Sequence, residues 1–129
     1  MDIKKIFLEG LLNIQSGNFK LQSHKLKQFF NNNKNEILKM LDEKETQAEV
    51  SKTINFLHEN KRDFYLSTIY LELLSEKFPN NLELKLILSK TYYQCRLLKL
   101  ALISIESIPK KIYTYEHYKL LINIYSKSK

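Results

Sequence analysis

Two consecutive segments of the chain share one pattern. Residues 48–81 read AEVSKTINFLHENKRDFYLSTIYLELLSEKFPNN, and residues 82–114 read LELKLILSKTYYQCRLLKLALISIESIPKKIYT. The final stretch, residues 115–129, reads YEHYKLLINIYSKSK and begins the pattern a third time. A period near 34 residues is typical of arrays in which each unit is one pair of helices. The sequence therefore predicts an all-α protein, a short α-solenoid of antiparallel helix pairs with about eight helices.

The composition favours the same class. The chain has 129 residues, the length of one domain, and 43% of them are hydrophobic, which is enough for a packed core. Two Gly and two Pro cannot supply the turns of a β-sandwich or barrel. Leu and Ile are abundant and Val occurs once, which favours helices over strands.

Apolar spacing and cap signals set the expected helix boundaries. Gly17 is suited to a left-handed helix end, and Pro79 and Pro109 each follow a helix. The segment Phe78-Pro79-Asn80-Asn81 is a helix stop followed by a cap. A polar loop is expected over residues 31–35, with Asn35 as an N-cap, and Thr46 with Glu49 forms a capping box. The helices predicted in this way span residues 3–15, 19–30, 36–43, 47–59, 64–77, 82–94, 97–107 and 113–126.

The repeated pattern resembles the tetratricopeptide repeat (TPR), in which small residues let two helices approach and large residues fill the space beside them. The matching positions are Ile54, Ser67, Leu71, Leu74 and Pro79 in 48–81; Leu88, Ser89, Tyr92, Ala101, Ile105 and Ile108 in 82–114; and Tyr118, Leu121 and Tyr125 in 115–129. Asn55 and Ile122 depart from the pattern, which has a small residue at their position. Residues 1–47 match weakly and form an N-terminal helical segment, either a cap or a degenerate repeat.

A narrower resemblance involves EVSKTINFLHENKRDFYLSTIYLELL, LSKTYYQCRLLKLAL and KLLINIYSKSK. These stretches look like the N-terminal repeats of the TPR scaffold subunits of the anaphase-promoting complex, a cell-cycle ubiquitin ligase. Tyr92-Tyr93 before a short turn and Ala101 after it are the features that match. The resemblance implies a non-enzymatic scaffold that binds proteins and forms a homodimer.

The TPR resemblance also implies where partners bind. The concave face of such repeats is formed by the first helix of each pair, and its candidates here are Phe56, Glu59, Lys90, Tyr93, Lys119 and Asn123. A second surface is expected at the end of the array. Tyr118, Leu121 and Tyr125 need a covering helix, so we expect self-association or tight binding to a larger assembly.

The formal net charge of +7 leaves an alternative open, a basic helical nucleic-acid-binding protein. The excess is almost all Lys, with only two Arg, whereas base and phosphate recognition favours Arg. The segment FKLQSHKLKQFFNNNK, residues 19–34, has two interpretations. Its Lys side chains could bind phosphate, or its Phe pair and Leu26 could pack inward while the Lys point outward.

Other classes find little support in the sequence. His24, His58 and His117 have no second ligand at helical spacing, and no nucleotide-binding or catalytic motif is present, so we expect no metal, no cofactor and no enzyme. Cys95 is alone and cannot form an internal disulfide, which favours the cytoplasm or nucleus. We expect no membrane-spanning segment and no signal peptide.

Overall fold

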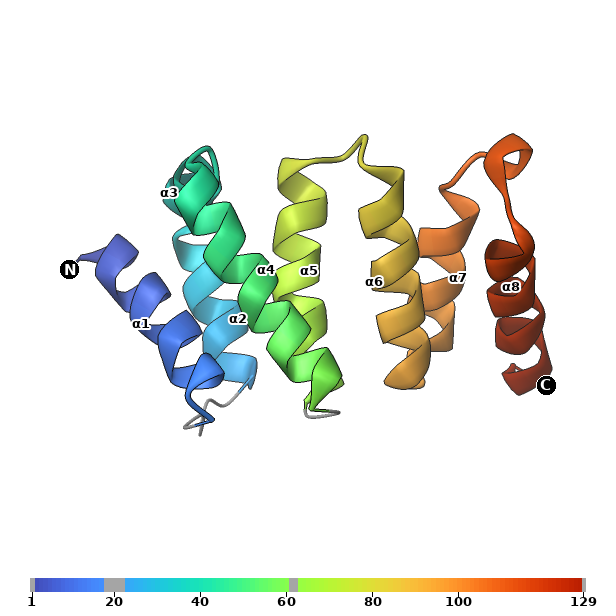
Figure 1. Ribbon diagram of the computed structural model, residues 1–129, viewed down its shortest axis with the longest axis horizontal. Helices are drawn as coiled ribbons and strands as arrows, with labels where there is room; N and C mark the ends of the chain where they lie inside the picture. Colours follow the sequence, from blue (N-terminus) through green and yellow to red (C-terminus); the bar gives the residue numbers. More distant parts are fainter. Residues whose placement is uncertain (1, 18–22, 61–62, 129) are drawn as a thin grey trace. The chain divides into compact units, whose positions relative to one another are not determined.

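The computed structural model describes residues 2–17, 23–60 and 63–128, and these contain helices and no strands. The chain divides into two compact units, Met1–Leu73 and Leu74–Lys129, which are described separately below. Figure 1 shows the elements in chain order. They are α1 (Ile3–Gln15), α2 (Ser23–Asn32), α3 (Lys34–Met40), α4 (Lys44–Glu59), α5 (Phe64–Lys77), α6 (Leu82–Gln94), α7 (Leu98–Glu106), a 3-10 turn η1 (Lys110–Ile112) and α8 (Tyr115–Lys127).

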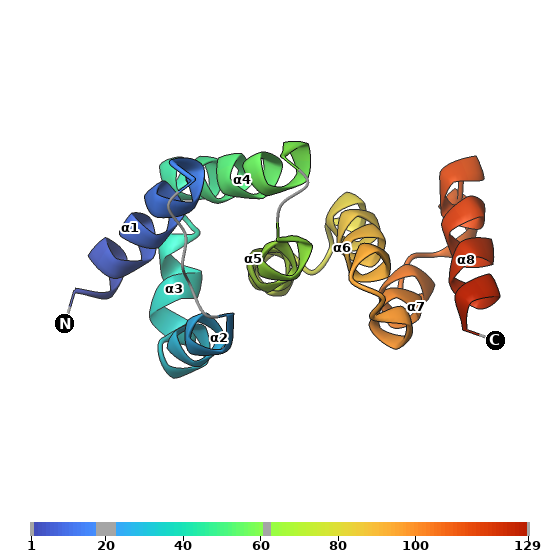
Figure 2. The same cartoon turned by 90° about the horizontal axis from the view of Figure 1, so that it is seen from below.

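In the first unit α1 packs against α3 and α4, and α2 packs against α3. Lys4 Nζ lies 3.0 Å from Glu43 Oε2, and Gln15 Nε2 donates to Thr53 Oγ1 at 3.0 Å. Because both residue numbers rise together, α1 and α4 run in the same direction. They lie side by side in Figures 1 and 2. The buried stripe of α1 is Phe7, Leu11 and Ile14, as its helical spacing predicts.

In the second unit α6 and α7 form the closest pair. Ser89 Oγ donates to Ala101 O at 2.7 Å, and Ser104 Oγ donates to Lys85 O at 2.8 Å. Residue numbers rise on one helix as they fall on the other, so the two helices are antiparallel. Ser89 and Ala101 are completely buried, and α8 packs against both helices. The small residues of the repeated pattern therefore lie where the two backbones come closest.

The turn between α6 and α7 requires a left-handed residue. Arg96 has φ 61°, a conformation that costs an ordinary residue about 1–2 kcal/mol. Arg96 N donates to Tyr93 O at 3.0 Å, and Leu97 N donates to Tyr92 O at 2.9 Å. These two bonds define a Schellman motif, which satisfies carbonyls at the end of α6. The motif lets α7 begin at Leu98, four residues after α6 ends.

Several predicted boundaries are confirmed. The helices over 3–15, 64–77 and 82–94 have the predicted ends, and Gly17 has φ 79°. Asn81 caps α6, since its side chain accepts from Leu84 N at 3.1 Å. Pro109 follows α7 and precedes η1. The first residues of the helix predicted over 19–30 lie outside the described part of the chain.

Two predictions were wrong. The loop expected over residues 31–35 is mostly helix, because α2 continues to Asn32 and α3 begins at Lys34, so Asn35 caps nothing. Phe30 and Ile37 are buried on either side of the Asn-rich run, and their packing holds both helices. The capping box at Thr46 is also wrong. The helix α4 begins at Lys44, and Thr46 is buried with its hydroxyl 3.4 Å from Glu43 Oε2.

Replacing Arg96 by Gly should stabilise the protein. Glycine adopts the left-handed conformation without the steric penalty but loses more entropy on folding, so we expect a net gain of about 0.5–1 kcal/mol. The measurement is the free energy of unfolding from urea titration monitored by circular dichroism. Arg96→Ala is the control, because it removes the same side chain without adding backbone freedom. Equal stability of the two variants would contradict a strained Arg96.

Candidate functional site

The predicted concave-face residues lie on three helices. Phe56 and Glu59 are on α4, in the first unit, where Phe56 is half-buried and Glu59 is exposed. The other four belong to the second unit. Lys90 and Tyr93 lie on α6 and are half-buried. On α8, Lys119 is exposed and Asn123 is half-buried. Lys90 forms an ion pair with Glu116, which joins α6 to the first turn of α8. The charge of Lys90 is therefore already partly balanced within the unit.

The outward face of α8 is the main exposed apolar feature of the second unit. Tyr115 is 80% exposed, Ile122 63%, and Tyr118 and Tyr125 each 49%. Leu121 is half-buried beside them. The opposite side of the same helix is buried through Leu120 and Ile124. The helix α8 thus has two apolar faces, one packed within the unit and one directed to solvent.

Two of these residues were missed by sequence reasoning. Tyr118, Leu121 and Tyr125 were predicted to form an end face, whereas Tyr115 and Ile122 were not considered part of it. A signal was present in the sequence, because residues 115, 118, 122 and 125 follow the 3-4-3 spacing of a heptad stripe. The repeated pattern assigned Ile122 to a buried small-residue position, which concealed this stripe.

The N-terminal end of α8 is fixed by aromatic contacts. Tyr113 Oη donates to Ile105 O at 2.7 Å, so the chain two residues before α8 is tied to the end of α7. The Tyr113 ring stacks on His117 at a centroid distance of 5.0 Å and meets the edge of Tyr118 at 5.2 Å. Burial, with the charge of Glu106, raises the pKa of Tyr113 and keeps its hydroxyl a donor. Tyr118 is therefore held in place although half of it is exposed.

A serine and a histidine meet between α4 and α5. His58 Nε2 lies 2.7 Å from Ser67 Oγ, and the His58 ring also contacts Phe64. A catalytic pair would need an accessible serine and a carboxylate to orient the histidine. Ser67 is completely buried, and among the described residues no carboxylate is hydrogen-bonded to the His58 ring. The pair ties the two helices together and is not arranged for nucleophilic attack.

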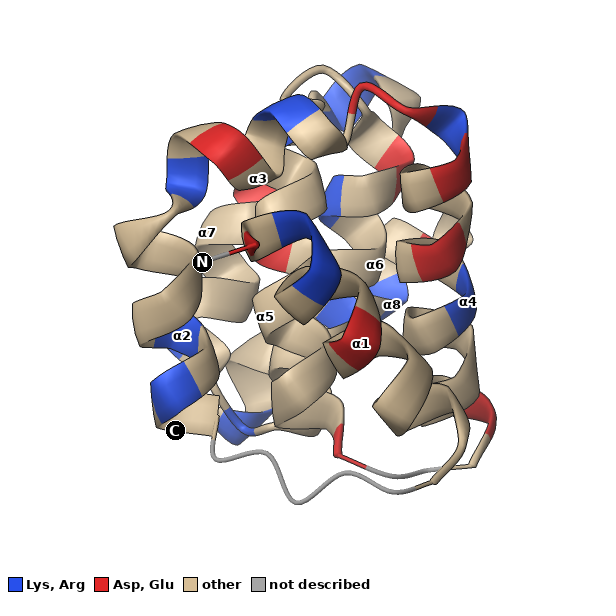
Figure 3. Cartoon of the chain, turned by 90° about the vertical axis from the view of Figure 1, so that its left-hand side faces the viewer, with Lys and Arg blue, Asp and Glu red and all other residues tan. Residues whose placement is uncertain are grey.

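The Lys-rich segment follows the packing interpretation where it is described. Leu26 and Phe30 are buried, and the exposed Lys27 lies with its Nζ 5.4 Å from the centre of the Tyr65 ring. Residues 19–22 of this segment lie outside the described part of the chain. In Figure 3, α1, α3 and α4 each carry basic and acidic positions, whereas α2 carries only basic ones; Lys4 and Lys52 each pair with a glutamate. Three of the four described helices that lie entirely in the first unit therefore carry mixed charge, and the lysines of α2 are the exception.

Residues 2–17, 23–60 and 63–128 contain no group of three His, Cys, Asp or Glu placed to hold a metal ion. Over the same ranges, no helix has the length and apolarity needed to cross a bilayer. Comparisons with protein-family models, curated proteins and solved structures give no match to this chain.

His58 should make stability depend on pH. Burial lowers its pKa below the ordinary value of 6.5, so the folded protein favours the neutral ring. Below about pH 6.5 the unfolded chain binds more protons than the folded one, and stability falls as pH decreases. We expect the urea midpoint to drop between pH 7.5 and 5.5, and to drop less in His58→Gln. His24→Gln, at an exposed histidine, is the control and should retain the full decline. An identical decline in all three proteins would contradict the assignment.

Proposed function

We propose that this chain is a non-enzymatic protein-interaction module of TPR type that associates with a second copy of itself through α8. The observation that carries the proposal is the outward face of α8, on which Tyr115, Tyr118, Ile122 and Tyr125 are all exposed. Monomeric proteins rarely expose contiguous apolar patches larger than a few hundred Å², and tyrosine is enriched where proteins meet.

The packing of α6 on α7 supports the TPR assignment. Ser89 and Ala101 occupy the two small-residue positions of the pattern, and both are completely buried at the helix contact. Large residues of the pattern surround them and are also buried: Leu88, Tyr92, Ile105 and Ile108. The same division of small and large residues is what the repeat family uses to bring two helices together. A full array of such pairs, 48–81, 82–114 and 115–129, is part of the proposal.

The spacing along α8 favours a second copy of this chain as the partner that covers its exposed face. The 3-4-3 spacing reads the same in both directions, so two α8 helices can meet antiparallel around a twofold axis. Tyr115 of one copy then faces Tyr125 of the other, and Tyr118 faces Ile122. These four residues include no charged side chain, so the centre of the contact has no like-charge repulsion.

The size of the face sets the strength of the association. Tyrosine buries roughly 150–250 Å² when fully covered, so this partly exposed set offers on the order of 400 Å² per copy. A stable interface usually buries about 800 Å² on each partner. We therefore expect a weak dimer, which further contacts in a larger assembly would strengthen. A scaffold of the cytoplasm or nucleus, such as a cell-cycle ubiquitin ligase, is the setting that the resemblance suggests.

Ile122→Glu should abolish self-association. The substitution places a charge at the centre of the face, and because Ile122 is 63% exposed the fold should remain intact. The measurement is sedimentation velocity over about 5–500 μM, with unfolding followed separately. The wild-type weight-average mass should rise toward a dimer, with a dissociation constant on the order of 10–100 μM.

Leu12→Glu is the matched control, because Leu12 is an apolar residue on α1 that is 56% exposed. It should associate like the wild type. A wild-type protein that stays monomeric throughout this range, or equal loss of association in both variants, would overturn the proposed role of α8.

A further inference from the structure

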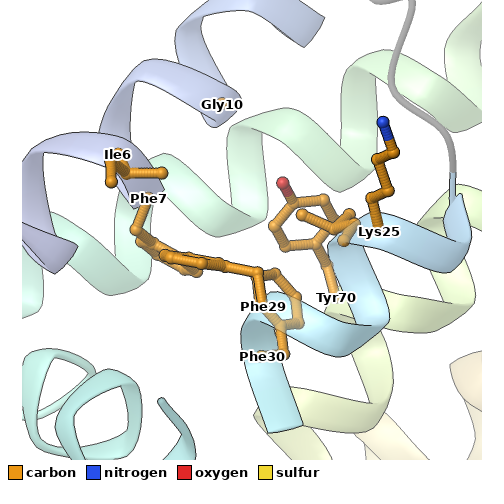
Figure 4. A pocket seen from close by; sticks show the side chains of 8 residues that line it. Ile6, Phe7, Gly10, Lys25, Phe29, Phe30 and Tyr70 are labelled. Atoms are coloured by element: carbon orange, nitrogen blue, oxygen red, sulfur yellow. The ribbon is translucent and has the colours of Figure 1, made fainter. Parts of the chain in front are cut away.

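The first unit contains a cavity between α1 and α2 that none of the roles above uses. Its volume is about 200 Å³. Phe7 and Gly10 line it from α1, Phe29 and Phe30 from α2, and Tyr70 from α5. Figure 4 shows these side chains around the cavity. An engineered apolar cavity of about 150 Å³ takes up benzene, so this one has room for a single ring or a short alkyl chain.

The walls of the cavity are a fixed aromatic cluster. The ring centroids of Phe7 and Phe30 are 5.6 Å apart, and those of Phe30 and Tyr70 are 5.3 Å apart in an edge-to-face arrangement. Phe7 also meets Tyr70 edge-on at 6.2 Å. All three side chains are at least 96% buried, so packing holds the cluster on the sides that do not face the cavity. An apolar ligand would therefore meet a preformed surface.

One polar group faces this apolar space. Tyr70 is only 1% exposed, and a Cβ atom at Gly10 would lie 3.7 Å from its hydroxyl oxygen, so the hydroxyl points to α1 across the cavity. Burial raises the pKa of Tyr70 far above its ordinary value, so the hydroxyl remains a donor. An acceptor on a ligand in the cavity could therefore take a hydrogen bond from this hydroxyl.

A positive charge lies at the same end of the cavity. Lys25, an exposed residue of α2, also lines it. In Figure 4, Ile6 and Phe7 lie at one end and Tyr70 and Lys25 at the other. One end of the cavity is therefore apolar, and the other has the Tyr70 hydroxyl and the Lys25 side chain, whose ammonium group is directed away from the tyrosine ring in Figure 4. This is the complement of a small molecule with an apolar body and an anionic oxygen head.

We propose that this cavity binds a small amphiphilic carboxylate with a short alkyl or single-ring body. The body contacts Phe7, Phe29 and Phe30. The carboxylate accepts a hydrogen bond from the Tyr70 hydroxyl and pairs with the Lys25 ammonium group. The site lies entirely in the first unit and is independent of the proposed dimer face on α8.

The test uses octanoate as the probe and octanol as its uncharged counterpart, on the full chain, by isothermal titration calorimetry and amide NMR. Octanoate should bind and shift amides of α1 and α2, and octanol should bind more weakly. Tyr70→Phe keeps the ring and should weaken octanoate about tenfold, the effect of losing one hydrogen bond to a charged group. Lys25→Met should remove the preference for octanoate over octanol.

Two variants separate binding from folding. Lys27→Met, two residues further along α2 and outside the cavity lining, should bind octanoate like the wild type. Gly10→Leu should fill the cavity and abolish binding, with circular dichroism confirming the helices. Octanol binding as tightly as octanoate, or unchanged octanoate affinity in Tyr70→Phe and Lys25→Met, would overturn the proposed carboxylate site. So would octanoate that leaves the amides of α1 and α2 unshifted.

Discussion

The contact between Ser89 and Ala101 is the interaction on which the second unit depends. A serine hydroxyl on α6 reaches a carbonyl on α7 at 2.7 Å, which is possible only because neither residue has a large side chain. The close approach buries Leu88, Tyr92 and Ile105 around it. These two helices then form the surface against which α8 packs Leu120 and Ile124. A larger residue at either position would push the two backbones apart, and the surface on which α8 packs would be disrupted.

Much of this architecture could be predicted because its causes are local. Pro79 stops α5 after Lys77, Asn81 starts α6, and Gly17 follows α1, each through chemistry that involves only neighbouring residues. The boundary between α2 and α3 could not be predicted in this way. Asparagine is poor in helix interiors, but burial of Phe30 and Ile37 outweighs that preference. Tertiary packing determines this boundary, so the local sequence pattern does not predict it.

The candidate surfaces show the same limit. Helical periodicity identifies apolar stripes but does not show which stripe is buried. Helix α8 has one buried apolar stripe and one exposed apolar stripe. Tyr115 and Ile122 therefore looked like ordinary helix residues until the partners of Leu120 were known. The cavity near Tyr70 is a stronger example, because its walls come from α1, α2 and α5. No spacing within one segment could bring Phe7, Phe30 and Tyr70 together. The repeat pattern predicted the burial of Ser89 and Ala101, but it did not predict the exposure of Ile122 or the presence of the cavity.

The short turn at Arg96 has a consequence for the order in which the second unit folds. Because only three residues, Cys95 to Leu97, separate α6 from α7, pairing these helices closes a very small loop and costs little chain entropy. Contacts of such low sequence separation form early. The α6–α7 hairpin is thus expected to form before α8 packs against it. Helix α8 would then pack on the formed hairpin, and its tyrosine-rich face would remain exposed to solvent.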